Sequence, residues 1–327
     1  EGTANAAAAT VTRISDGLRL AAGNSECKPS RPNWTQRPLN FVVPVESDRW
    51  PVNCGEKVVE AAGGVALCTA LAKVAKNREL VVTLAGSSDT ATLASFLSRA
   101  PAQVLVFAID DDAAAVRSAA DGRAGVAVVD VPAATRELTP LALKYALFEG
   151  VLRAGCSALF ADVSTAWSDS PWGYFSRDTD IEAASTTDSY LRTGRVVSVD
   201  DAQMGWSRYA QSLAISALSP RLFYAVATHE SANLMRFVQV RIADGAGSEA
   251  HRSSHAAGEK EDFVFTAEAI GPAHDGKRVA GVSVRVMHSN CFGTGRGSVA
   301  AAPQAPGGGA VEGRWGGGPS PNQILES

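Results

Sequence analysis

Short runs of apolar, mostly β-branched or aliphatic residues recur along this 327-residue chain and most constrain its fold. The runs cover residues 80–84, 104–109 and 158–163, and stretches with helical spacing of apolar residues separate them. Strands that are apolar along their whole length are buried on both faces, as in a parallel sheet covered by helices. The pattern therefore predicts an α/β fold with a doubly wound, mostly parallel sheet and helices on both faces.

The helical spacing and one further apolar run complete this prediction. Helices are expected at residues 56–75, 91–97, 113–120 and 140–154, and a strand is expected at residues 126–131. We expect three of the strands to lie side by side in one parallel sheet, namely those that end at Leu84, Ile109 and Val163.

The charge balance narrows the classes of partner. The chain has 30 basic and 34 acidic side chains and a net charge of −4, whereas a nucleic-acid-binding protein usually carries a basic stripe. The apolar runs are also shorter than the roughly 18–20 residues that a bilayer span needs. We therefore expect neither a nucleic-acid partner nor a membrane span in this chain.

The composition divides the chain into three parts. Residues 1–54 mix Ala, Asn, Ser, Pro and Arg without sustained periodicity and are expected to form an irregular segment. Residues 55–296 carry the alternating strands and helices and are expected to form the functional domain. Residues 297–327 are rich in Gly, Pro and Ala, which cannot build a packed core, so they are expected to form a flexible tail.

The five cysteines show no spacing typical of a metal site. They are Cys27, Cys54, Cys68, Cys156 and Cys291, and their odd number rules out complete internal pairing. Two interpretations remain open: buried free thiols, or one disulfide in a secretory setting such as Cys27–Cys54.

Polar residues follow the buried strands at the positions where ligands bind in open α/β sheets. These positions are Thr83 with Ala85, Asp110 to Asp112, and Asp162 to Ser164. A carboxylate directly after a buried strand needs a partner or a ligand, or it caps the next helix. We interpret Asp111 and Asp112 as helix-capping residues and Asp162 as a functional residue.

Residues 144–175 carry a set of features in a characteristic order. Lys144 begins the set, Leu152 with Gly155 precedes an apolar strand, and 162–167 reads Asp-Val-Ser-Thr-Ala-Trp, followed by Ser-Pro at 170–171. This order resembles the nucleotide-diphospho-sugar transferase domain of glycosyltransferase family 77, found in plant and algal wall and glycoprotein glycosylation. The resemblance covers roughly residues 60–240.

The resemblance implies a GT-A-type fold and a donor site built around an Asp-x-Asp motif. In the family, such a motif holds a divalent ion, Mn²⁺ or Mg²⁺, against the diphosphate of the donor. Here Asp162 matches the first Asp, and Ser164 stands where the second would be, so any metal ligation by Ser164 is weak. The other donor-binding residues that the resemblance implies are Thr83, Ala85, Asp110, Lys144, Gln203 and Gly205.

The implied activity is transfer of a pentose or galactose from a nucleotide-sugar donor to a glycan or glycoprotein acceptor. The implied location is the secretory pathway, specifically the Golgi lumen. Because the family's Asp-Gln pair matches Glu230-Ser231 and the second Asp is replaced, a competing hypothesis is a catalytically inactive subunit for binding or assembly. The enzyme hypothesis needs another acid to complete the site, such as Asp188 or Glu230.

Overall fold

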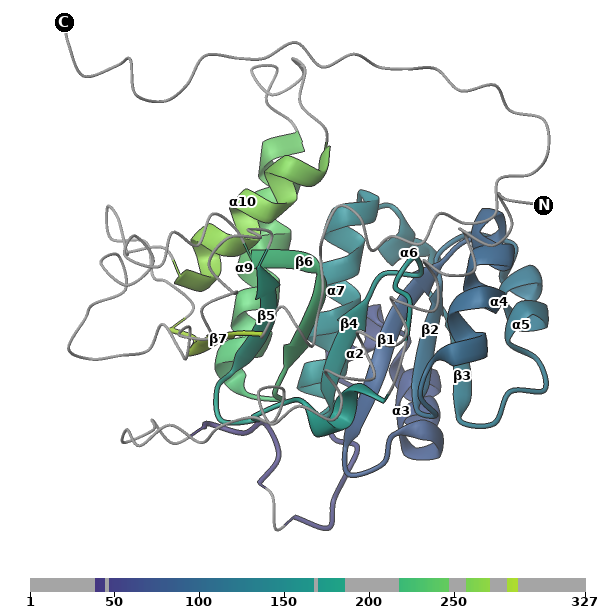
Figure 1. Ribbon diagram of the computed structural model, residues 1–327, viewed down its shortest axis with the longest axis horizontal. Coiled ribbons are helices and arrows are strands. Elements are labelled where there is room, and N and C mark those ends of the chain that lie inside the picture. Colours follow the sequence, from purple (N-terminus) through teal and green to yellow (C-terminus); the bar gives the residue numbers. More distant parts are fainter. Residues whose placement is uncertain are drawn as a thin grey trace, which may run out of the picture.

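A seven-stranded sheet forms the centre of the computed structural model (Figure 1). The structure describes residues 39–44, 47–167, 170–185, 218–246, 257–270 and 281–287. The strands lie in the order β3-β2-β1-β4-β6-β5-β7, from right to left in Figure 1. Their bounds are β1 Glu79–Ala85, β2 Val104–Ala108, β3 Val126–Asp130, β4 Ser157–Ala161, β5 Ile181–Ser185, β6 Leu218–Ala225 and β7 Val284–Val286.

The first four strands are parallel and confirm the predicted arrangement. Val81 of β1 pairs with Val104 on one side and with Leu159 of β4 on the other, and β3 pairs with β2. The strands that were expected to end at Leu84, Ile109 and Val163 therefore lie side by side. The parallel pairing of β5 with β7 makes the sheet mostly parallel, as predicted.

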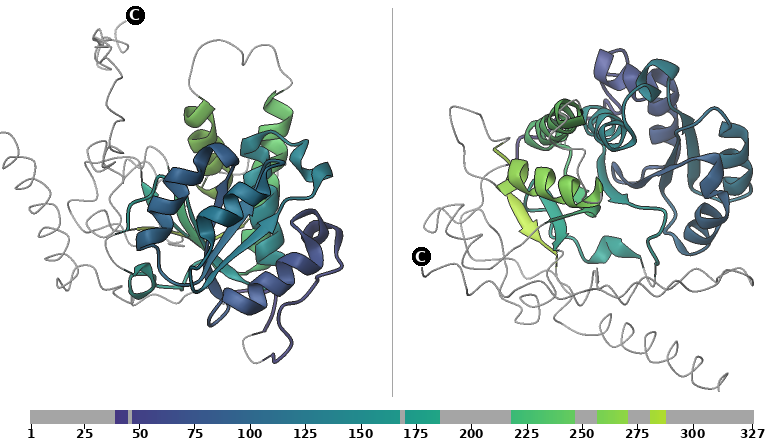
Figure 2. Two further views of the ribbon diagram at one scale, coloured as in Figure 1. Left: turned by 90° about the vertical axis from the view of Figure 1, so that its right-hand side faces the viewer. Right: turned by 90° about the horizontal axis from the view of Figure 1, so that it is seen from above.

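Helices cover both faces of the sheet, because alternate side chains of each buried strand point to opposite faces (Figure 2). One face, with Val82 and Phe107, packs against α3 (Gly64–Val74), α7 (Pro140–Arg153) and α10 (Ala257–Ile270). The other face, with Val81 and Val106, packs against α4 (Thr90–Arg99) and α5 (Ala113–Ala120). The remaining helices are α2 (Lys57–Ala61), α6 (Ala133–Arg136) and α9 (His229–Ala246), with short 3₁₀ turns at Ser87–Asp89 and Pro171–Gly173.

The helix that was expected at residues 56–75 is divided into α2 and α3. The break lies at Gly63, whose φ of +118° places it in the left-handed region that favours glycine. A Cβ atom on Gly63 would lie 2.8 Å from Cγ1 of Val129, so a larger residue does not fit there. The turn lets α3 follow the sheet toward β3.

The part of the sheet beyond β4, which contains β6, β5 and β7, includes one antiparallel strand. β6 runs antiparallel to both of its neighbours, β4 and β5. Its Phe223 stacks on Phe160 of β4 and packs against Phe148 of α7, which joins the two halves through one aromatic cluster. None of the helices in the described ranges is long and apolar enough to cross a membrane.

One disulfide bond is present, and it differs from the pairing considered from the sequence. Cys54 is bonded to Cys68 of α3, with 6.1 Å between their Cα atoms, so the Cys27–Cys54 pairing is wrong. The interpretation of Cys54 and Cys68 as free thiols is also wrong, whereas Cys156 is a buried free thiol. The disulfide bond links the segment before α2 to α3. Cys27 and Cys291 lie outside the described residues.

Residues 39–44 and 47–54 lack helices and strands of their own but pack on the amino ends of the central strands. The Val42 amide donates to the Ala227 carbonyl at 2.9 Å, and the Trp50 indole donates to the Gly155 carbonyl at 2.9 Å. The Asn53 side chain donates to the Arg153 carbonyl at 2.9 Å. The predicted tail at 297–327 and the first 38 residues lie outside the described part of the chain.

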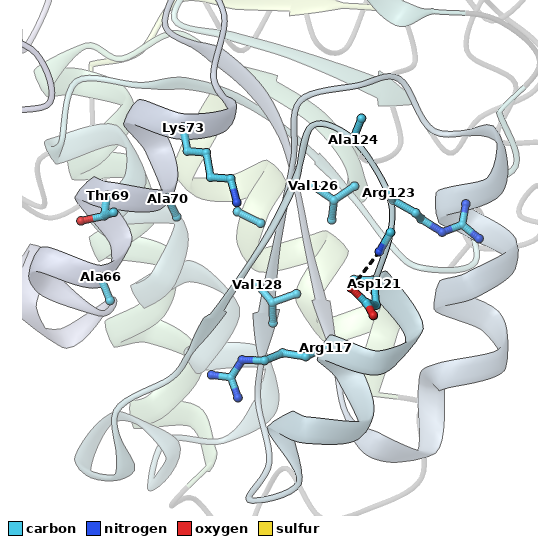
Figure 3. A pocket seen from close by; sticks show the side chains of 13 residues that line it. Ala66, Thr69, Ala70, Lys73, Arg117, Asp121, Arg123, Ala124, Val126 and Val128 are labelled. Atoms are coloured by element: carbon cyan, nitrogen blue, oxygen red, sulfur yellow. Dashed lines mark hydrogen bonds between the residues drawn. The ribbon is translucent and has the colours of Figure 1, made fainter.

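β3 forms one margin of the sheet, and a groove of about 730 Å³ runs beside it (Figure 3). The groove lies between α3 and the end of α5, and β3 lines it with Val126, Ala127 and Val128.

Candidate functional site

The carboxyl ends of β1, β2 and β4 meet at one edge of the sheet. Ala85 at the end of β1 pairs with Ala108 at the end of β2, and Val82 pairs with Phe160 near the end of β4. The residues that follow these strands are Gly86, Asp110 and Asp162. The structure therefore brings together the predicted donor-binding positions from three separate segments of the chain.

The turns after β1 and β2 are joined through Asp110. Its Oδ2 atom accepts a hydrogen bond from the amide of Ser87. This bond lowers the pKa of Asp110, because an N–H donor stabilises the ionised carboxylate. The fit is close, since a Cβ atom on Gly86 would lie 2.9 Å from Oδ2 of Asp110. The carboxylate is thus held ionised and fixed in place.

Two buried oxygen atoms at this edge have no hydrogen-bond partner among the described residues. They are Oγ1 of Thr83 and Oδ1 of Asp110. A buried polar group without a partner costs about 1–3 kcal/mol, so native proteins pair such groups with protein, water or ligand. The two atoms are therefore candidates to hydrogen-bond a bound molecule.

Asp162 follows β4 and is half-buried in a short turn. Its Oδ1 atom accepts hydrogen bonds from the amide of Ser164 at 2.9 Å and from the Ser164 hydroxyl at 2.7 Å. The Asp162 amide in turn donates to the carbonyl of Arg221 on β6 at 3.1 Å. Ser164 therefore orients one oxygen of Asp162, and no hydrogen bond joins the other oxygen to a residue that the structure describes, so that oxygen can contact a ligand.

The described residues do not form a metal site by themselves. Within the part of the chain that the structure describes, no group of three His, Cys, Asp or Glu side chains is placed to hold a metal ion. Ser164 directs its hydroxyl to Asp162 and brings no charge of its own. A divalent ion prefers several hard anionic oxygens, so Asp162 with Ser164 fits such an ion poorly.

Lys144 lies on α7 and is only 7% exposed, which excludes a solvated lysine on a helix surface. Its Nζ atom donates to Oε1 of Glu261 on α10 at 2.5 Å and to the carbonyl of Pro220 on β6 at 2.6 Å. The ammonium group also lies 4.4 Å from the centre of the Phe160 ring. Burial lowers the pKa of Lys144, while the charges of Glu261 and Asp162 act in the opposite direction. Lys144 thus links α7, β6 and α10 behind the end of β4.

Sequence reasoning missed the acidic residues of α10. Glu261 is buried and also accepts a hydrogen bond from the Tyr145 hydroxyl at 3.0 Å. Asp262 is close enough to contribute to the electrostatic field at Lys144, as Asp162 does. Glu261 lies 117 positions after Lys144, so no local pattern in the sequence signals this pairing.

Glu230 and Ser231 lie at the other edge of the sheet. They follow β6, whose last residue Ala225 pairs with Ala158 at the start of β4. Glu230 accepts a hydrogen bond from the Asn40 side chain at 3.3 Å, and the Ser231 hydroxyl donates to the carbonyl of Asp180 at 3.0 Å. Glu230 therefore does not supply a second acid beside Asp162. Asp188, Gln203 and Gly205 lie outside the described residues.

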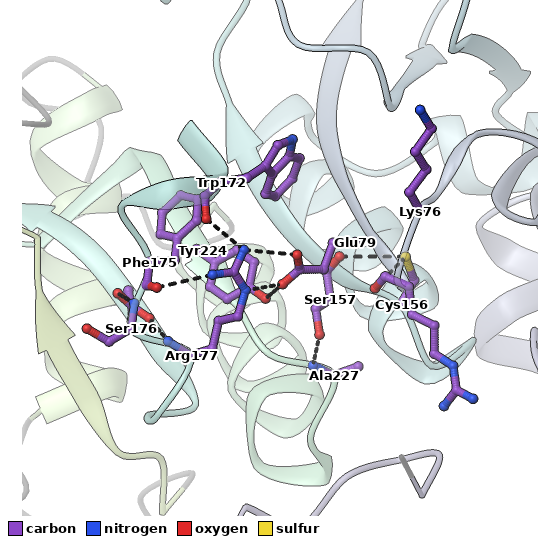
Figure 4. Close-up of polar contacts among 12 residues, drawn as sticks. Lys76, Glu79, Cys156, Ser157, Trp172, Phe175, Ser176, Arg177, Tyr224 and Ala227 are labelled. Carbon is purple, nitrogen blue, oxygen red and sulfur yellow. Dashed lines mark hydrogen bonds and ion pairs between the residues drawn. The ribbon is translucent and has the colours of Figure 1, made fainter. Parts of the chain in front are cut away.

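The chain after Asp162 crosses from the site to the opposite edge of the sheet, where Arg177 fastens it (Figure 4). The Arg177 guanidinium donates to both carboxylate oxygens of Glu79 at the start of β1, at 2.5 and 3.0 Å. The Tyr224 hydroxyl donates to the same carboxylate, and the Tyr224 ring stacks on Phe175 at 4.6 Å between centres. This crossing segment, residues 162–178 apart from 168–169, is thus tied to β1 and β6.

Comparison with known proteins agrees with this arrangement. The profile of the family described as nucleotide-diphospho-sugar transferase matches residues 102–304. Arabinosyltransferase RRA2 of Arabidopsis thaliana is 28% identical over 234 residues, which cover 68% of this chain and 51% of that protein. The chain thus spans about half the length of this curated relative. The resemblance found in residues 144–175 is confirmed, and the chain belongs to the nucleotide-diphospho-sugar transferase family.

Proposed function

We propose that this domain binds a nucleotide sugar at the edge formed by β1, β2 and β4 and transfers the sugar to a glycan or glycoprotein acceptor. The observation that carries the proposal is the pair of buried oxygens on Thr83 and Asp110 that have no partner in the described part of the chain, at the same edge as Asp162. Family membership supports sugar transfer as the reaction class. The name of the plant relative, an arabinosyltransferase, favours a pentose as the sugar.

The proposed roles follow from the placement of each residue. Asp110 is ionised and fixed by Ser87, so its free oxygen accepts hydrogen bonds from hydroxyl or N–H groups of the nucleoside. Thr83 and Ala85 border the same part of the nucleotide. Asp162 faces the sugar of the donor, where its carboxylate accepts hydrogen bonds from sugar hydroxyl groups.

Lys144 is assigned an indirect role in this proposal. The sequence predicted a direct contact between Lys144 and the donor, but Glu261 and the Pro220 carbonyl already bind its ammonium group, so we assign Lys144 an electrostatic role instead. The remaining positive field of Lys144 acts on Asp162 from behind β4.

The proposal assigns a place to a divalent ion as well. Mn²⁺ or Mg²⁺ arriving with the donor diphosphate would meet Asp162 as its carboxylate ligand among the described residues, with Ser164 as a weak neutral neighbour. Action in the secretory pathway, and in the Golgi lumen in particular, is proposed by analogy with plant glycosyltransferases.

Replacing Asp162 by alanine is expected to abolish donor binding, because Asp162 is the carboxylate that directly follows β4 at the proposed donor edge. Calorimetric titration of a panel of nucleotide sugars, with and without Mn²⁺, measures this. Asp121→Ala is a matched control, since it removes an exposed carboxylate at the end of α5 and should bind as the parent does. Unchanged binding by Asp162→Ala would place the donor elsewhere.

Replacing Ser164 by aspartate is expected to strengthen Mn²⁺-dependent binding. Ser164 Oγ lies 2.7 Å from Oδ1 of Asp162, so a carboxylate there adds a second hard anionic ligand beside the first. The gain should be about tenfold or more in affinity, which corresponds to about 1.4 kcal/mol. Without metal, the two carboxylates repel each other and the variant should melt at a lower temperature than the parent.

A non-catalytic binding or assembly subunit is the second candidate function. The engagement of Asp162 by Ser164, with no three-ligand group among the described residues, favours it. The same titrations separate the candidates. If the parent, Asp162→Ala and Ser164→Asp all fail to bind any nucleotide sugar, the transferase proposal is wrong and the subunit hypothesis gains support.

A further inference from the structure

The outer edge of β3 carries backbone groups that no described strand pairs with. Its register with β2 fixes their direction, because the Gly125 carbonyl accepts from the Val104 amide and the Val131 amide donates to the Ala108 carbonyl. The backbone groups of the odd-numbered residues of β3 therefore bond to β2. Because backbone groups of successive residues point to opposite sides of a strand, those of the even-numbered residues point away from β2. The amides and carbonyls that point to the outer edge belong to Val126, Val128 and Asp130.

The groove beside this edge has the shape that an added strand requires. Its volume is about 730 Å³, and its two walls come from α3 and from the end of α5 (Figure 3). Ala66 and Ala70 line the first wall and Ala120 the second, so small side chains leave room for a backbone about 4.8 Å from β3. Val126 and Val128 are only half-buried, and a further strand would cover them.

The charges around the groove are mainly positive, although the chain as a whole has a net charge of −4. Lys73, Arg117 and Arg123 line it, against one acid, Asp121. Arg117 is paired with Asp130, and Arg123 donates to a carbonyl of α4. Lys73 is exposed and forms no ion pair with any residue that the structure describes. An occupant with acidic side chains would meet this charge.

We propose that the free edge of β3 binds an extended acidic segment of a partner protein, which joins the sheet as an eighth strand. Its backbone pairs with the outward groups of Val126, Val128 and Asp130. Because side chains alternate between the two faces of a strand, its carboxylates lie on the face of α3, where they reach Lys73, and its apolar residues lie on the face of α5, beside Val126 and Val128. This surface lies on the margin of the sheet, apart from the edge that carries Asp162, so it does not depend on the proposed donor site.

A labelled peptide of alternating Glu and Val residues tests this proposal on the full chain by fluorescence anisotropy. Lys73→Glu is expected to weaken binding by about tenfold, because it reverses a charge on the wall of the groove. Lys57→Glu is the matched control, since it makes the same charge change on α2, outside the groove, and should stay within about twofold of the parent. A peptide of alternating Lys and Val should bind at least about tenfold more weakly than the acidic one.

Hydrogen exchange separates strand addition from loose electrostatic attraction. On addition of the acidic peptide, the amides of Val126, Val128 and Asp130 should exchange more slowly. Val128→Pro removes an outward N–H that β2 does not use, and proline is tolerated on edge strands. This variant should lose peptide binding while its melting temperature stays close to that of the parent.

Several results would overturn the proposal. They are equal binding of the basic peptide, equal weakening by Lys57→Glu and Lys73→Glu, and no binding at millimolar peptide. Slow exchange of the three amides in the free chain would show that the edge is already covered. If that protection disappears on dilution, a second copy of the chain is the occupant instead. Should Val128→Pro unfold, Lys73→Glu with its control still decides the outcome.

Discussion

Lys144→Met is expected to lower the free energy of unfolding by about 3–5 kcal/mol, the usual cost of removing one partner from a buried ion pair. The variant leaves the buried carboxylate of Glu261 with the Tyr145 hydroxyl as its remaining donor among the residues that the structure describes. It also leaves the Pro220 carbonyl without the ammonium group. Urea unfolding followed by tryptophan fluorescence measures the change.

A double variant tests whether the loss comes from the unpaired charge. Adding Glu261→Gln to Lys144→Met removes that charge, and the amide oxygen still accepts from Tyr145, so the double variant should be more stable than Lys144→Met alone. Lys57→Met is the control, because Lys57 is exposed and the change should stay within about 0.5 kcal/mol. A loss below about 1 kcal/mol in Lys144→Met would contradict the assigned pairing.

Glu182 is expected to make the stability of the domain depend on pH. It is 2% exposed on β5, and burial raises its pKa to about 7 from the usual 4.5. Its carboxylate accepts from the amides of Arg177 at 2.6 Å and Ser176 at 3.1 Å, and Arg285 and Asp178 contribute opposing charges nearby. The contribution of Glu182 to the free energy of unfolding is therefore fully present below pH 4.5 and is lost as the pH rises from 4.5 to about 7. Above about pH 7, this contribution no longer changes with pH.

The size of this effect is about 3 kcal/mol across that range. Unfolding in urea at a series of pH values, compared between the parent and Glu182→Gln, isolates it. The free energy of the parent should fall toward pH 7 relative to that of the variant, whose side chain does not titrate. Glu60→Gln, on the exposed surface of α2, should follow the parent. Parallel curves for the parent and Glu182→Gln would show that Glu182 does not govern the slope.

The parallel half of the fold could be predicted because its signals are local. Continuous apolar runs mark β1, β2 and β4, and the expected helix at 113–120 has the observed bounds of α5. Asp112 caps that helix as interpreted, since its carboxylate accepts from the Ala115 amide at 3.2 Å. β6 gave no such signal, because Pro220 and Arg221 interrupt its apolar pattern. Its place depends on pairing with β4, which is remote in the sequence.

The candidate site could be predicted to a similar extent. Asp110 and Asp162 follow recognisable strands, so the sequence alone indicates that they share an edge. The partner of Lys144 could not be found in this way, because Glu261 reaches it only after the chain has crossed the sheet. The sequence motif placed Glu230 in the donor site, but the structure does not. Because β6 runs antiparallel to β4, the residues after β6, Glu230 among them, lie at the opposite edge of the sheet.

The position of β6 also sets an order in which the domain can assemble during synthesis. β1 to β4 and the helices between them all precede residue 162, so this part of the sheet can pair and be covered before the later strands are synthesised. The outer side of β4 must wait for residues 218–225, and among the described strands β5 pairs with β6 and β7, which both follow it in the sequence. Unpaired strand edges invite association with other chains, so the nascent protein is most exposed to aggregation during this interval.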